Sequence, residues 1–431
     1  RNFLTFDLGR KMGHYAPRTV YCELVINGDY KGIYILMEKI KRDKDRVDIA
    51  KLDADDLAGD SLTGGYIIKV DKYTGTGGVD WLSDFPNISG GLLYIQYHYP
   101  EATALQPQQL NYIEQYVDSF EYALNGLNFA DTSIGYAKYI DINSFIDFYI
   151  INEISKNIDG YRLSTYMHKD KESKGGKLTM GPFWDFNLAF GNADYCNGGI
   201  TSGWEVNGAG CGDYNPFWFE RLLDDTIYEN KLKCRWEYLR EKSFHQDSIF
   251  NFIDSMALYL NDAQQRNFQQ WPTLGTYVWP NFYVGNTYQD ELNFFKNWIG
   301  DRLLWIDNNL GGNCYEILGC TDPFACNYDP LANTNDGSCN YNSASYDTLF
   351  SAISISWNGL NLISSGDYSY PLINSSGCDS IANINFTIII SGILNLPTTQ
   401  SKYLIKVTDV LGRETKGFKN ETLFYIYDDG T

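Results

Sequence analysis

The chain has 431 residues, a hydrophobic fraction of 44% and a formal net charge of −20, so it is long enough for several domains and acidic overall. This charge excludes nucleic acid as an expected partner, because phosphate binding needs clustered Lys and Arg side chains. No apolar run reaches the roughly 18 residues of a membrane-spanning helix, so we expect no transmembrane segment.

The first hundred residues predict a short helix followed by strands. Residues 2–13 fit a helix that ends at Gly13. Asn27-Gly28 is a typical two-residue hairpin turn between two strands. The expected strands cover residues 19–26, 32–39, 64–70 and 91–98.

The middle of the chain predicts helices. Residues 107–125 carry apolar side chains at helical spacing and are followed by Gly126 as a stop. Residues 142–155 fit a second helix, with Asp141 or Asn143 as N-cap. Further helices are expected over residues 246–262 and 288–310. Strands that precede helices indicate an α+β, two-lobed domain.

After Gly312 the composition changes sharply, which predicts separate small modules. Turn formers and oxygen-bearing side chains dominate residues 319–341, and later segments alternate like strands. We expect four regions, with small all-β modules at the carboxyl-terminal end: 1–312, 313–341, 342–390 and 391–431. The abrupt start and stop of the sequence also indicate a fragment at both ends.

The nine cysteines are concentrated towards the carboxyl-terminal third. Clustered Cys in a loop-rich segment indicates disulfides and an oxidising compartment, although the pairing cannot be read from the sequence. An odd number leaves at least one thiol unpaired. No Cys/His set has the spacing of a zinc site.

Two acidic residues flank a predicted hairpin in the middle of the chain. Asp159 lies in a loop after a buried helix, and Asp185 follows the strand pair formed from residues 164–168 and 177–183. Phosphoryl transfer uses one carboxylate to orient the incoming hydroxyl and another to hold the metal on the nucleotide phosphates. The alternative is that both aspartates are turn or cap residues in ordinary core surroundings.

Three stretches resemble the spore-coat protein H (CotH) kinase family, in that family's order and over roughly 310 residues. They are residues 27–40 (NGDYKGIYILMEKI), 157–161 (NIDGY) and 184–187 (WDFN). The resemblance implies an atypical protein-kinase fold, ATP with Mg²⁺ or Mn²⁺, and phosphorylation of Ser or Thr in exported proteins. It places Asp159 as catalytic base, Asp185 as metal ligand and Glu38 near the nucleotide and the hinge between lobes.

The sequence departs from the family pattern at three places. Ser164 replaces an Asn, and Asn187 replaces a second acid, at two positions that the resemblance assigns to metal binding. The phosphate loop and its Lys normally precede the first helix, so we expect them outside this sequence; Lys69 is a substitute nucleotide ligand or a strand Lys that faces solvent. These departures support an alternative function, a weak or inactive kinase-like domain that serves as a surface adhesin or structural binding module.

The sequence carries no motif of a serine hydrolase or a zinc protease. It contains neither a Gly-x-Ser-x-Gly elbow nor a His-Glu-x-x-His helix. Carboxylates are plentiful enough for a glycosidase, but nothing singles out a pair.

The Cys-rich segment predicts calcium binding. It resembles the short thrombospondin type 3-like repeats of exported bacterial proteins, which supply hard oxygen ligands at short spacing. The alternative is a turn-rich linker held by disulfides alone. The candidate ligands are Asp322, Asn327, Asp329, Asn333, Asn335 and Asp336.

The last two regions resemble modules of exported surface proteins of Bacteroidetes. Residues 342–390 look like a small β-sandwich-like module, and residues 391–431 look like a truncated carboxyl-terminal sorting domain of the type IX secretion system. This resemblance implies an extracellular or cell-surface location. It also implies the type IX secretion machinery and an exported protein substrate or surface partner as the expected partners.

Overall fold

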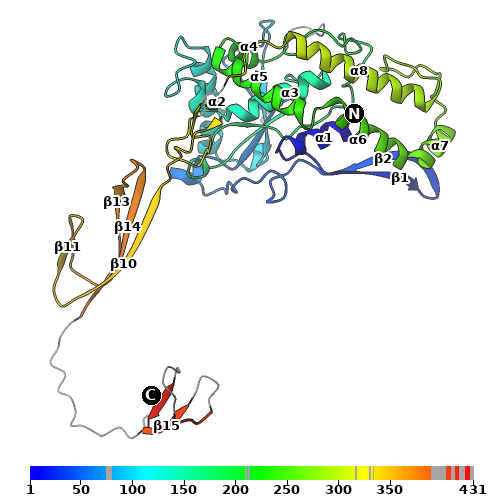
Figure 1. Cartoon of the computed structure of the whole chain (residues 1–431). Helices are drawn as coiled ribbons and strands as arrows, with labels where there is room; N and C mark the ends of the chain where they lie inside the picture. The colour runs from blue at the N-terminus through cyan, green and yellow to red at the C-terminus, as the bar shows by residue number, and fades with distance from the viewer. Residues whose placement is uncertain are drawn as a thin grey trace. The chain divides into compact units, whose positions relative to one another are not determined.

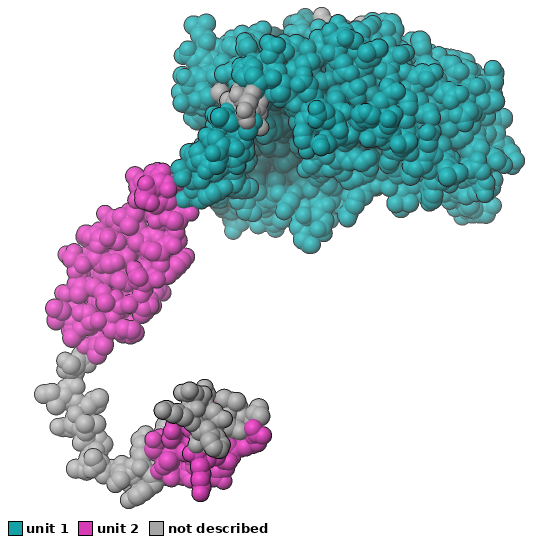
Figure 2. Space-filling view, viewed as in Figure 1, with its two compact units in different colours: residues 1–341 teal, residues 342–431 magenta. Residues whose placement is uncertain are grey.

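The computed structural model divides the chain into two compact units, residues 1–341 and 342–431 (Figure 2). It describes residues 1–73, 80–208, 211, 214–315, 318–329, 332, 334–389, 404–408, 413–416 and 423–427.

The described part of the first unit contains a two-stranded hairpin, a five-stranded sheet and a short parallel pair near its carboxyl-terminal end. β1 (Thr19–Ile26) and β2 (Asp29–Met37) form an antiparallel hairpin, and Asn27 and Gly28 both adopt positive φ, as the predicted turn requires. A five-stranded antiparallel sheet has the order β4-β5-β3-β6-β7. Its strands are β3 (Tyr66–Val70), β4 (Asp80–Leu82), β5 (Tyr94–Tyr99), β6 (Thr165–Lys169) and β7 (Thr179–Met180).

Helices make up most of the rest of this unit (Figure 1). The α-helices are α1 (Asn2–Lys11), α2 (Pro107–Asn125), α3 (Ile142–Ser155), α4 (Trp218–Leu223), α5 (Thr226–Glu241), α6 (Gln246–Tyr259), α7 (Asn261–Gln270) and α8 (Tyr288–Asn309). Short 3-10 helices cover Gly59–Leu62, Ala102–Ala104, Tyr136–Lys138 and Glu172–Lys174.

Helix α3 is the central element of the helical part, in contact with α1, α5 and α8 (Figure 1). Asp141 caps its start by accepting hydrogen bonds from the backbone N–H groups of Asn143 and Ser144. Almost every residue of the helix is buried, which explains why a segment rich in Ile and Phe stays helical despite its modest intrinsic propensity. The helix ends at Lys156, which adopts the left-handed conformation with φ 44°.

Helix α2 packs one apolar face against the same core. Pro107 occupies its first turn, and Gln106 and Gln109 form a reciprocal capping box. The apolar stripe that the sequence predicts is buried along the helix, with Phe120 in edge contact with Phe145 and Trp218.

The carboxyl-terminal end of the first unit is fixed by disulfides. Cys234 of α5 bonds to Cys314, and Cys320 bonds to Cys339 across the Cys-rich segment. This segment carries the short strands β8 (Leu318–Gly319) and β9 (Thr334–Asn335). The thiol of Cys22 is free, as the odd number of cysteines requires.

The second unit is built of strands. β14 lies between a parallel neighbour, β10, and an antiparallel neighbour, β13. The antiparallel pairs β11-β12 and β15-β16 are the other described strands of this unit. The bounds are β10 (Ser343–Ser351), β11 (Ile355–Trp357), β12 (Leu360–Leu362), β13 (Gly366–Ile373), β14 (Asp379–Ile388), β15 (Leu404–Thr408) and β16 (Phe424–Tyr427).

The architecture is a mixed α+β domain followed by strands, as the sequence predicts. The expected single helix over 246–262 is instead two helices, α6 and α7, which meet at Leu260. Helices α4 and α5 were not predicted. In the described part of the chain, no helix is long and apolar enough to cross a membrane.

Candidate functional site

The loop that carries Asp159 is a series of tight turns after α3. Gly160 N–H donates to the Asn157 carbonyl (2.7 Å) and Leu163 N–H donates to the Asp159 carbonyl (3.0 Å). Gly160 is required by space, because a Cβ atom there would lie 2.5 Å from Oδ1 of Asn152. The loop therefore holds Asp159 in a fixed place just beyond a rigid helix.

Asp159 forms an ion pair within this loop. Its Oδ1 accepts a hydrogen bond from Nη2 of Arg162 at 2.8 Å, and both side chains are about one-fifth exposed. Arg162 also donates to the Ile158 carbonyl through Nε and Nη2 (3.2 and 3.1 Å). This arrangement orients the Asp159 carboxylate and leaves one of its oxygens outside the ion pair.

Asp185 follows β7 in a sharply turned segment with φ 64°. The next residue, Phe186, donates its N–H to the side chain of Asn2 in α1 (2.6 Å), which anchors the turn. Asp185 is exposed, and the Ser164 hydroxyl lies near its carboxylate. Partial desolvation raises the pKa of Asp185, and the nearby charges of Asp159 and Asp71 raise it further, whereas the nearby Ser164 hydroxyl lowers it.

The structure therefore brings Asp159, Ser164 and Asp185 close enough to interact. A fourth residue, Asp71, also lies close enough to Asp185 for its charge to act on it. The sequence reasoning missed Asp71. The pairing of β3 with β6 matches Val70 to Thr165, so the next residues of the ladder, Asp71 and Ser164, leave the sheet at the same end. A strand-pairing register is the signal that would have identified it.

Lys69 lies at the same end of the sheet. Its ammonium pairs with Asp71 at 2.6 Å and lies 5.8 Å from the ring centre of Tyr166, its partner on β6. Its side chain is only 20% exposed, so it does not simply face solvent. Burial raises the pKa of Tyr166 to about 12, and Asp71 and Asp185 contribute to this shift.

The contacts that the structure describes for Glu38 and Asn187 involve none of the other predicted site residues. Glu38 accepts hydrogen bonds from the side chain and backbone of Arg18 and lies 3.4 Å from Nε of Arg46. The Arg18 hydrogen bond is the main reason why the pKa of Glu38 falls to about 2. Asn187 is exposed, and its backbone carbonyl accepts a hydrogen bond from Asn192.

The side chains around Asp185 fit a divalent metal that arrives with a nucleotide. Among residues that the structure describes, no group of three or more His, Cys, Asp or Glu side chains is arranged to hold an ion by itself. Mg²⁺ is commonly held by one or two carboxylates, with phosphates and water as the other ligands. The Asp185 carboxylate and the Ser164 hydroxyl supply hard oxygens of this kind.

In the Cys-rich segment, three of the predicted calcium ligands cap local turns. Asp322, Asn335 and Asp336 accept backbone N–H groups two residues ahead at 2.9 Å. Asn327 bonds to the backbone of Ser338 and Asn340, both at 2.7 Å. The backbone N–H of Asp329 donates to the carbonyl of Cys320 (2.9 Å). Asn333 lies outside the described residues.

Comparison with known proteins identifies the first unit. The family model described as CotH kinase protein matches residues 1–306, which is well over half of the chain. No curated protein matches the chain. The matched region includes both Asp159 and Asp185. The chain therefore belongs to the CotH kinase family.

Proposed function

We propose that the first unit is an atypical protein kinase that transfers the γ-phosphate of ATP to Ser or Thr hydroxyls of exported proteins. Asp159 accepts the proton of the incoming hydroxyl, and Asp185 holds a Mg²⁺ or Mn²⁺ ion. The observation that carries the proposal is the meeting of Asp159, Ser164, Asp185 and Asp71 at one end of the β3–β6 pair.

The surroundings of each carboxylate suit its proposed role. Arg162 orients Asp159, so the free carboxylate oxygen is directed for a hydrogen bond with a hydroxyl. A bound metal would neutralise charge on the nucleotide phosphates. Metal binding needs the deprotonated carboxylate, and the raised pKa of Asp185 moves that deprotonation to higher pH. Lys69 is the proposed contact for a phosphate oxygen once it leaves Asp71.

The second candidate function is a kinase-like surface module that binds without transferring phosphate. Ser164 and Asn187 are weaker ligands than the residues that the family pattern implies at these positions. Two of the nearby carboxylates are already paired, Asp71 with Lys69 and Asp159 with Arg162. This function predicts nucleotide binding with little or no turnover.

The remaining features favour an exported protein. The disulfides of the first unit are consistent with an oxidising compartment. Export by the type IX system rests on the resemblance of residues 391–431; of these, β15 and β16 are described as an antiparallel pair. The calcium site in residues 319–339 stays a prediction, supported by oxygen-rich turns.

Labelling of the full chain with γ-labelled ATP and Mg²⁺ or Mn²⁺ tests the kinase proposal. We expect label on the wild type and its loss in Asp185→Ala. Asp254→Ala is the control, because Asp254 is an exposed carboxylate on α6 that pairs with Lys296. Equal labelling of wild type and Asp185→Ala would refute the proposal. An ATP-dependent rise in melting temperature without any label would support the binding module instead.

A further inference from the structure

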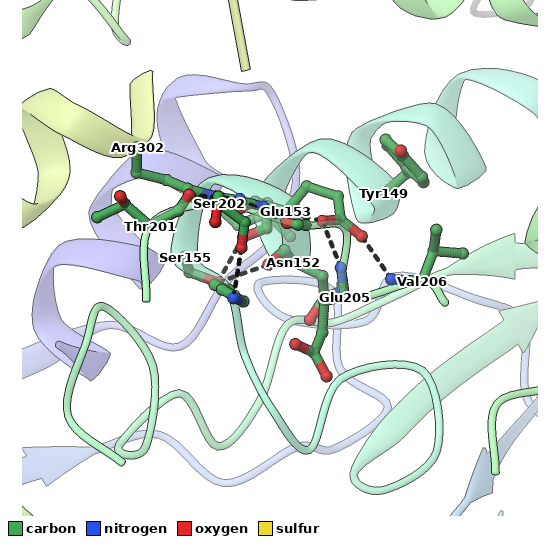
Figure 3. Close-up of polar contacts among 12 residues, drawn as sticks. Tyr149, Asn152, Glu153, Ser155, Thr201, Ser202, Glu205, Val206 and Arg302 are labelled. Carbon is green, nitrogen blue, oxygen red and sulfur yellow. Dashed lines mark hydrogen bonds and ion pairs between the residues drawn. The ribbon is translucent and has the colours of Figure 1, made fainter. Parts of the chain in front are cut away.

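Two buried cations hold consecutive carbonyl groups of the segment that follows Asp185. Lys156 comes from the end of α3 and Arg302 from α8, and both are at most 1% exposed. The segment at residues 200–203 has neither helix nor strand, so its backbone groups depend on such partners (Figure 3). Lys156 donates to the carbonyls of Ile200 (2.9 Å) and Ser202 (2.7 Å), and Arg302 donates to those of Thr201 (2.8 Å) and Gly203 (2.7 Å).

Glu153 of α3 holds the backbone of the residues that follow this segment. Its carboxylate accepts the backbone N–H groups of Glu205 and Val206, both at 2.8 Å (Figure 3). It also pairs with Arg302 at 3.0 Å, and Nε of Arg302 donates to the Glu153 carbonyl at 2.7 Å. We call Glu153, Lys156 and Arg302 the clamp. Hydrogen bonds to charged groups are stronger than neutral ones, and here water does not compete for them.

The clamp is connected to the Asp159 loop. Lys156 lies three residues before Asp159, and Glu153 accepts the hydroxyl of Tyr161 at 2.9 Å. A disulfide joins Cys196 to Cys211, one on each side of the clamped residues. Nη2 of Arg162, which pairs with Asp159, lies 3.6 Å from the sulfur of Cys211. The same contacts therefore fix the loop and the segment.

The backbone of Lys156 indicates that its side chain is needed. Its φ of 44° lies in the left-handed region that Gly and Asn adopt with least strain. A Lys at this helix end brings backbone strain and also a buried charge. Both are compensated by the two carbonyl hydrogen bonds that only a long cationic side chain can reach from here.

Protein kinases often order the segment after the metal-binding Asp by phosphorylation, which creates new Arg–phosphate contacts. We propose that the clamp residues are positioning residues that keep this segment permanently ordered, so that the site at Asp159 is assembled without phosphorylation. The catalytic part of this inference rests on the proposed kinase function, whereas the ordering of the segment does not.

Hydrogen exchange of the full chain, followed by mass spectrometry, tests the ordering. In Lys156→Met we expect amides of residues 200–206 to exchange about tenfold faster or more, from the loss of charged hydrogen bonds, with no change in α2. Lys177→Met is the matched control, because the ammonium of this partly buried Lys also donates to a carbonyl, that of Ala137 at 2.8 Å. Lys156→Gly relieves the backbone strain but lacks the ammonium, so it is expected to fold and to show the same faster exchange.

Phosphatase treatment and kinetics test the consequence for the site. We expect treated and untreated wild type to show the same exchange and the same rate of self-labelling. We expect Lys156→Met to lower the kcat of self-labelling and to leave the KM for ATP unchanged. Unchanged exchange in both Lys156 variants, or loss of order or activity after phosphatase treatment, would overturn the inference. A wild type that transfers no phosphate would overturn only the kinase function, because the exchange result still decides the ordering.

Discussion

Replacement of Glu205 by Gln is expected to flatten the pH dependence of stability between about pH 5 and pH 8. Glu205 is 2% exposed, and its Oε2 has no hydrogen-bond partner among the described residues. Burial, and next the charge of Glu153, raises the pKa of Glu205 from 4.5 to about 8. The folded state therefore keeps a proton on this side chain at pH values where the unfolded chain has lost it.

The sign and size follow from proton linkage. Below pH 4.5 both states are protonated and the full stability is present; as pH rises towards 8, the folded state binds more protons than the unfolded state, so stability falls. The slope contributed by one group is at most about 1.4 kcal/mol per pH unit, which gives an upper bound on the order of 5 kcal/mol across this window. Gln has nearly the same shape and does not titrate, so the variant gains relative stability towards pH 8.

Urea unfolding at pH 5, 6.5 and 8 measures the effect, with buried Trp218, Trp236 and Trp298 as fluorescent reporters. Glu237→Gln, at a half-exposed position on α5, is the control. Some slope will remain, because burial also raises the pKa of Glu121 to about 7. Parallel curves for wild type and Glu205→Gln would refute the reasoning.

Two further measurements address the disulfides and the calcium prediction. In Cys234→Ser/Cys314→Ser, which opens a loop with a sequence separation of 80 residues, we expect a loss of about 4–5 kcal/mol on the chain-entropy model; unfolding curves identical to those of wild type would contradict it. For calcium, EGTA is expected to lower the melting temperature of the chain, because a ligand at 100 times its Kd contributes about 2.7 kcal/mol. An unchanged melting temperature would count against the site in residues 319–339.

Much of the fold could be predicted because its signals are local. The β1–β2 hairpin is encoded by Asn27-Gly28, and α3 by the cap at Asp141 and a run of apolar residues. Helix α5 was missed because its sequence is rich in charged residues, and it is held by the packing of Tyr228, Leu232 and Trp236 in the core. The break at Leu260 was missed because the apolar pattern continues up to it.

Part of the site was also predictable from local sequence. Asp159 and Asp185 can be recognised from their order along the chain, each beside a predicted helix or strand. Asp71 and Arg302 cannot, because their roles depend on contacts with segments about 90 to 150 residues away in the sequence. No periodicity or motif in a single sequence records contacts of that kind.

The bond between Cys234 and Cys314 also determines how mechanical load passes through the first unit. A pull applied beyond Cys314 travels through the disulfide directly into α5. The chain between the two cysteines, which includes α6, α7 and α8, then lies outside the path of the force. As long as this bond is intact, tension cannot unwind α8 from its carboxyl-terminal end, and Arg302 stays in place on an unloaded helix.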